Sequence, residues 1–92
     1  MKVNVTGPLG IIEETQSVGS YNKIHKRRCV VYSSKGPIPI DFVYDTVTLL
    51  DEYKVGDKVS IFCILEGREW TKPGTSKKQY FLSLRGVSIT RQ

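Results

Sequence analysis

The sequence has no long hydrophobic run. None of its apolar stretches approaches the roughly 20 residues that a membrane-spanning helix needs. Residues 1–5 alternate polar and apolar side chains and lack the continuous apolar segment of a signal peptide. We therefore expect no membrane insertion and a cytoplasmic location. With 92 residues the chain can enclose one hydrophobic core, so we expect one domain over residues 1–92.

Metal-ligating residues are scarce. The chain has one histidine, His25, and two cysteines, Cys29 and Cys63, with no Cys-x-x-Cys pair. A zinc site would therefore lack ligands at the usual spacing, and we expect no metal and no cofactor. Both cysteines lie in apolar runs, where a reduced thiol behaves as a small hydrophobic side chain.

Catalytic motifs are absent as well. There is no phosphate-binding Gly-x-x-x-x-Gly-Lys motif, and His25 lies in a basic segment without an evident carboxylate partner. The closest acidic pairs, at 13–14 and 51–52, are adjacent residues whose side chains diverge in either a strand or a helix. The sequence therefore predicts neither an enzyme nor a small-molecule substrate.

Positive charge is present in excess, and it is unevenly distributed. The net charge is +5, with +5 in residues 17–36, −4 in residues 37–57 and +4 in residues 66–92. Two basic segments separated by an acidic one predict a positive face that attracts polyanions.

The order of predicted elements indicates an all-β fold. A long strand over 3–18, bent at 7–10, precedes strands over 26–33 and 38–45. Asp45 can cap a helix over 46–53, in which Val47, Leu50 and Tyr53 recur every three residues. Strands over 58–68 and 79–90 follow, separated by a polar loop at 71–78. This order predicts a five-stranded OB-fold barrel with a short helix between strands three and four, and with basic loops bordering its binding groove.

The second half of the chain resembles the bacterial single-stranded-DNA-binding proteins. A Lys-Val-Gly-Asp turn at 54–57, an Arg-x-Trp strand end at 68–70 and a tyrosine-led last strand from 80 occur in the same order. The whole chain, over about 6–90, is more similar still to a family of short, tail-less OB-fold proteins from bacteria and phages. That family shares the Tyr-Lys-Val-Gly-Asp turn and the Leu-Glu-x-Arg-Glu-Trp ending.

The resemblance implies a role for three residues. It places Trp70 where an indole stacks on a base, Arg68 beside it, and Tyr44 at a second stacking position. Tyr21 and Tyr32 are weaker stacking candidates, and the basic residues expected to contact phosphates are Lys23, Lys26, Arg28, Lys72, Lys77 and Lys78. Aromatic platforms beside cations bind single strands with little sequence preference.

The direction of Tyr44 stays open at this stage. Its face of the third strand also carries Ile38, Ile40 and Phe42 and is the more apolar one, so by default it faces the core. The family pattern points Tyr44 outward and Val43 inward, and a β-bulge near Asp41 would reconcile the two.

The expected function is non-specific binding of single-stranded DNA in replication, recombination or repair. An RNA-binding OB module is one alternative, because the sequence does not show which sugar the protein prefers. A protein-protein adaptor that binds no nucleic acid is the other, with the aromatic face as a protein interface. We also expect a homo-oligomer, a dimer or larger, since related OB folds associate through their strands.

Overall fold

The computed structural model describes residues 1–18 and 24–92. These residues form six strands and one 3₁₀-helix. The strands are β1 (Lys2–Ile12), β2 (Gln16–Val18), β3 (Ile24–Ser33), β4 (Gly36–Val43), β5 (Lys58–Thr71) and β6 (Lys78–Arg91), and the helix η2 (Tyr44–Glu52) follows β4. No helix in the described part of the chain is long and apolar enough to cross a membrane.

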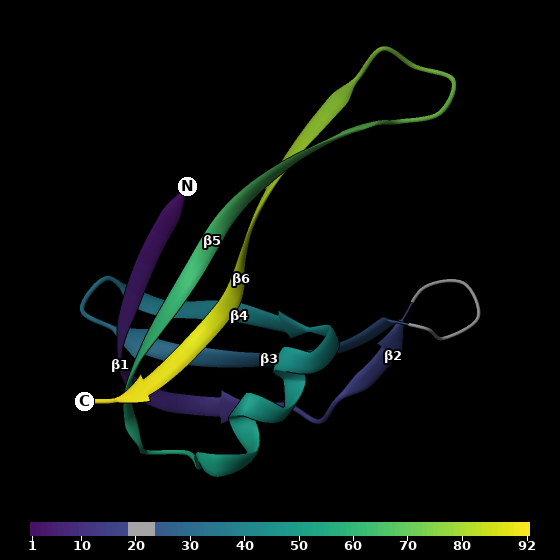
Figure 1. Ribbon diagram of the computed structural model, residues 1–92. Helices are drawn as coiled ribbons and strands as arrows, with labels where there is room; N and C mark the ends of the chain where they lie inside the picture. Colours follow the sequence, from purple (N-terminus) through teal and green to yellow (C-terminus); the bar gives the residue numbers. More distant parts are fainter. Residues whose placement is uncertain (19–23) are drawn as a thin grey trace.

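The strands close into a ring. Their order in the sheet is β1-β5-β6-β4-β3-β2, and β1 also pairs with β3 (Figure 1). Closure between β4 and β6 rests on one parallel bridge, between Asp41 and Arg85. Because β2 continues the path of β1, this is the predicted five-stranded OB-fold barrel with one short helix, and the prediction is confirmed.

The bend in β1 lets one strand serve two neighbours. Its first part, from Lys2 to Pro8, pairs with β5, and the part from Leu9 to Ile12 pairs with β3, with a shift in register between Leu9 and Ile11. Gly7 lies at the change of direction with φ +154°, and a Cβ there would meet the carbonyl oxygen of Tyr32 at 2.5 Å. Glycine is therefore required for the close approach, and the bend predicted at 7–10 is confirmed.

The core is built from alternate residues of the long strands together with Val47 and Leu50 of η2. Its fully or almost fully buried members are Val5, Leu9, Cys29, Val31, Ile40, Phe42, Leu50, Val59, Ile61 and Cys63. The two cysteines are free thiols, as predicted. Burial raises the pKa of Cys29 to about 12 and that of Cys63 to about 11, so both stay protonated and apolar near neutral pH.

The alternation of buried side chains along β4 does not continue to Tyr44, the first residue of η2. Ile40 and Phe42 are buried, whereas Tyr44 is 58% exposed. No bulge causes this, because the β3–β4 register is unbroken from Lys26↔Val43 to Ser33↔Gly36. Tyr44 instead adopts a left-handed φ of 56°, which turns the chain into η2 and carries the ring outward. Of the two directions left open for Tyr44, the outward one of the family pattern is therefore observed, and no bulge near Asp41 is needed to produce it.

The helix begins earlier than predicted and is capped by a different residue. The hydroxyl of Thr46 donates to the Val43 carbonyl at 2.6 Å and accepts from the Val43 N–H at 3.1 Å, whereas Asp45 makes no cap. Val47 and Leu50 are buried, and the Tyr53 hydroxyl donates to the Ile89 carbonyl at 3.3 Å. Their three-residue spacing matches the period of a 3₁₀-helix, which closes one end of the barrel.

Gly86 provides a test of this packing. A Cβ at Gly86 would overlap the buried ring of Phe42, whereas a Cβ at Gly67 would meet only the Leu82 Cδ2 atom, at 3.9 Å. We predict that Gly86→Ala lowers the free energy of unfolding by about 1 to 3 kcal/mol through overpacking. The matched control Gly67→Ala should change it by about 0.5 kcal/mol or less. Urea unfolding of both variants measures this, and equal midpoints would contradict the described core.

Candidate nucleic-acid interface

β5 and β6 pair well beyond the barrel. Their ladder runs from Val59↔Arg91 to Thr71↔Lys78, whereas the pairing of β1 with β5 ends at Ile64 and that of β4 with β6 lies at Arg85. Residues 66–83 therefore project as a two-stranded ribbon, which rises away from the other strands in Figure 1. Such a ribbon exposes two faces, because successive side chains of a strand alternate and directly opposed residues share a face.

One face of the ribbon, here called the stacking face, carries Arg68, Trp70, Gln79 and Phe81. Arg68 lies opposite Phe81, and Trp70 lies opposite Gln79. The indole is 45% exposed and the Phe81 ring 46% exposed, and these four residues line a common shallow hollow. Two large aromatic surfaces are therefore open to solvent beside a guanidinium group that has no acidic partner among the described residues.

A groove continues from the stacking face toward the barrel. It has a volume of about 420 Å³, and Arg68 and Phe81 of the ribbon form one wall. Lys26 and Arg28 of β3 form the opposite wall, with Asp41 of β4 between the two strands. Since Arg68 and Phe81 line both the hollow and the groove, the aromatic platform and these cations form one surface.

Carboxylates hold the groove cations in place. Asp41 accepts hydrogen bonds from Arg28 at 2.8 and 3.3 Å, and the Lys26 Nζ atom lies 3.5 Å from the same carboxylate. The hydrogen bond to Asp41 and its charge raise the pKa of Arg28. Glu66, which also lines the groove, lies 3.3 Å from Arg85 at the base of the ribbon. The groove is therefore positive but partly neutralised.

Tyr44 lies at the other end of this surface. It lines a hollow with Arg85 and Ile64 on the outward side of β5 and β6. Outward positions of β6 then run from Arg85 through Phe81 to Gln79, a span of about 20 Å at the rise of an antiparallel strand. Tyr44, Arg85, Phe81, Arg68 and Trp70 thus follow one another along one side of the molecule.

The remaining predicted residues are scattered. Lys72 and Lys77 flank the ribbon tip, where the Lys72 N–H donates to the Lys77 carbonyl at 3.1 Å. Lys78 is on the face opposite Trp70 and forms an ion pair with Glu69 at 3.1 Å. Tyr32 lies near the far end of β3, where its ring packs over Gly10. Tyr21 and Lys23 fall outside the described residues.

Two residues of the surface were not predicted as site residues. Phe81 and Arg85 both face outward on β6, and the Phe81 ring is exposed to nearly the same fraction as the Trp70 indole. The sequence feature that could have identified Phe81 is the length of the loop at the ribbon tip. This loop pairs Thr71 with Lys78, and that register places Phe81 opposite Arg68. The described residues hold no group of three or more histidine, cysteine, aspartate or glutamate side chains that could bind a metal ion.

A family model covers residues 4–90 of the sequence, and its description is "Domain of unknown function (DUF3127)". The chain belongs to this family. Curated protein sequences give no significant match.

Solved structures share the fold. The mitochondrial single-stranded DNA-binding protein Rim1 of S. cerevisiae matches with a TM-score of 0.66 and 17% identity, covering 98% of this chain and 90% of Rim1. A small single-stranded DNA-binding protein from Streptomyces coelicolor matches with a TM-score of 0.58 and 17% identity, covering 100% and 94%. At these identities the likeness concerns the fold, and it confirms an OB barrel like that of single-stranded-DNA-binding proteins.

The exposure of Trp70 predicts how the protein tolerates its loss. Trp70→Ala removes a side chain from the projecting ribbon and leaves no cavity in the barrel core. The free energy of unfolding should therefore fall by about 1 kcal/mol or less, the range of surface substitutions. The same truncation of a buried aromatic residue would lower the free energy of unfolding by about 3 to 5 kcal/mol. Thermal or urea unfolding separates the two, and a loss in the higher range would show that Trp70 is structural.

Proposed function

We propose that this protein binds single-stranded DNA without sequence preference along the surface from Tyr44 to Trp70, and that it acts by binding and not by catalysis. The observation that carries the proposal is the stacking face, where Trp70 and Phe81 are both about half exposed beside Arg68. Large aromatic side chains exposed side by side lose hydrophobic stabilisation unless a ligand covers them.

The chemistry of the surface suits a nucleic acid in single-stranded form. Each base presents a π face, and a ring can stack on that face only when the base is not already stacked in a duplex. Arg68 is placed to neutralise a phosphate or to stack as a planar cation, and Lys72 and Lys77 extend the positive charge to the ribbon tip. Lys26 and Arg28 supply phosphate contacts across the groove. Stacking and charge together carry no sequence information, so affinity should depend little on base identity.

The stacking role can be tested one ring at a time. Trp70→Ala and Phe81→Ala should each weaken oligo-dT binding by about 1 to 3 kcal/mol, or roughly 5- to 150-fold. Val55→Ala is the matched control, because Val55 is exposed in the turn before β5, remote from the stacking face. Fluorescence anisotropy with labelled oligo-dT measures all three, with oligo-U and duplex DNA as parallel ligands. Unchanged affinity in both aromatic variants, or equal affinity for the duplex, would refute the proposal.

The electrostatic share of binding predicts a salt dependence. If about four phosphates are neutralised, log affinity should fall against log salt with a slope of about −3, because each phosphate contributes about −0.7 on single strands. Lys72→Glu/Lys77→Glu should flatten this slope while the circular-dichroism spectrum stays unchanged, since both residues lie at the exposed tip. A slope near zero in the wild-type protein would exclude a phosphate-binding groove.

A further inference from the structure

The barrel wall is open between β4 and β6. The two strands meet at one bridge, Asp41↔Arg85, and diverge on the ribbon side of it, so the stretch of β4 from Gly36 to Ile40 has no strand beside it there. A hollow of about 230 Å³ lies in this gap. Five of the eight residues that line the hollow are apolar, namely Ile38, Pro39, Leu65, Leu82 and Leu84.

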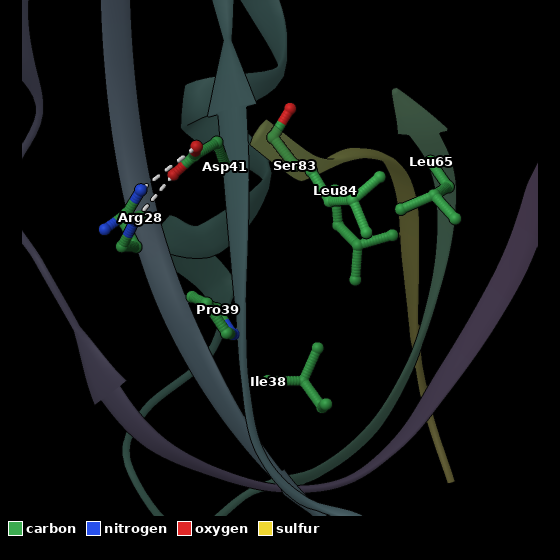
Figure 2. A pocket seen from close by; sticks show the side chains of 8 residues that line it. Arg28, Ile38, Pro39, Asp41, Leu65, Ser83 and Leu84 are labelled. Carbon is green, nitrogen blue, oxygen red and sulfur yellow. Dashed lines mark hydrogen bonds and ion pairs between the residues drawn. The ribbon is translucent and has the colours of Figure 1, made fainter. Parts of the chain in front are cut away.

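The hollow is continuous with the groove that carries the cations. Arg28, Asp41, Leu82 and Ser83 line both of them. Figure 2 shows Leu65 and Leu84 on one side of the hollow and the Arg28–Asp41 ion pair on the other. The apolar recess and the positive groove are therefore two parts of one cleft. A ligand that fits both parts has a negative charge tethered close to an apolar group.

The rim of the hollow offers both kinds of hydrogen-bonding group. Arg28 and the Ser83 hydroxyl can donate, and the Asp41 carboxylate accepts. Pro39 adds a second acceptor. Because proline has no N–H, the backbone polar atoms of Pro39 in its pair with Val30 face away from β3, and its carbonyl faces the gap. The recess thus combines apolar walls with a rim of donors and acceptors.

We propose that the hollow is a pocket for one base of the bound single strand, with the adjoining phosphate on Lys26 and Arg28. The proposal rests on the proposed function and adds to it a position where a base is inserted instead of stacked. A nucleobase is a flat ring with a polar edge that carries both donors and acceptors, which matches the walls and the rim. A cavity of about 150 Å³ holds benzene, so a hollow of about 230 Å³ has room for a pyrimidine with its substituents.

A pocket of this kind strengthens the preference for single strands. A base in a duplex cannot enter the hollow, because its complement occupies its polar edge and its neighbours cover its two faces. Since the rim holds both donors and acceptors, each of the four bases can find a partner there. The pocket therefore adds affinity for unpaired bases while leaving the sequence preference weak.

Nuclear Overhauser effects (NOEs) between isotope-labelled protein and oligo-dT test the pocket directly. The methyl groups of Ile38 and Leu84 should show NOEs to thymine protons, whereas those of the buried core residue Leu50 should show none. NOEs to the rings of Trp70 and Phe81 without any to the two hollow residues would overturn the pocket and leave the proposed function standing. No binding of oligo-dT at all would refute the function, and the pocket with it.

A variant that fills the hollow provides a second test. Ser83→Ile places a branched side chain at the rim and should weaken oligo-dT binding about fivefold or more, the lower end of the range for losing the contacts of one base. Quenching of Trp70 fluorescence at saturating oligo-dT should persist, because the stacking face is unchanged. Ser88→Ile is the matched control, since Ser88 is also exposed on β6 but does not line the hollow. Equal affinity of the two variants would count against the pocket.

Free thymidine 5′-monophosphate shows whether the base has to belong to a strand. At the concentration of oligo-dT that saturates the protein, the free nucleotide should leave the Ile38 and Leu84 resonances unshifted. It lacks the stacking and phosphate contacts that hold the rest of a strand nearby and raise the local concentration of the base. Saturation of the hollow by the free nucleotide at that concentration would identify a small-molecule site and overturn the proposal.

Discussion

The extra length of β5 and β6 determines most of what this molecule can do. Each has 14 residues, and their shared ladder continues after β1 and β4 have stopped pairing with them. The two-stranded ribbon projects past the barrel elements that could pack against its faces, so both faces remain exposed. One face presents Trp70 and Phe81 and the other Tyr80 and Leu82, all on one small element. A shorter hairpin would fold into the same barrel and lose both surfaces.

The groove beside the ribbon combines positive charge with fixed geometry. Asp41 holds Arg28 through two hydrogen bonds, and Glu66 lies close enough to hold Arg85. Side chains held in this way lose less conformational entropy when a phosphate binds. The same carboxylates compete with the phosphate for the cations and repel it. The charged groups therefore favour a moderate, salt-sensitive affinity. Stacking on Trp70 and Phe81 has to supply the remaining binding free energy.

The fold could be predicted from the sequence further than the site could. The bend at Gly7, the buried thiols and the spacing of Val47, Leu50 and Tyr53 follow from local patterns, and each was confirmed. The direction of Tyr44 stayed open because its left-handed backbone is imposed by the entry into η2, and alternation cannot report such a turn. The cap was missed because Thr46 satisfies the Val43 carbonyl and N–H from within the helix. Phe81 was missed because its position opposite Arg68 depends on the register of the β5–β6 hairpin, which the tip loop sets.

The central claim is that single-stranded DNA lies on the stacking face. Photo-cross-linking of the protein to an oligonucleotide containing 5-iodouracil, followed by mass spectrometry of the peptides, tests this most directly, because the reaction favours aromatic side chains in contact with the base. The account predicts that the cross-links fall on Trp70 and Phe81, with Tyr80 unmodified although it is the more exposed ring. Cross-links on Tyr80, or none on the ribbon at all, would contradict it.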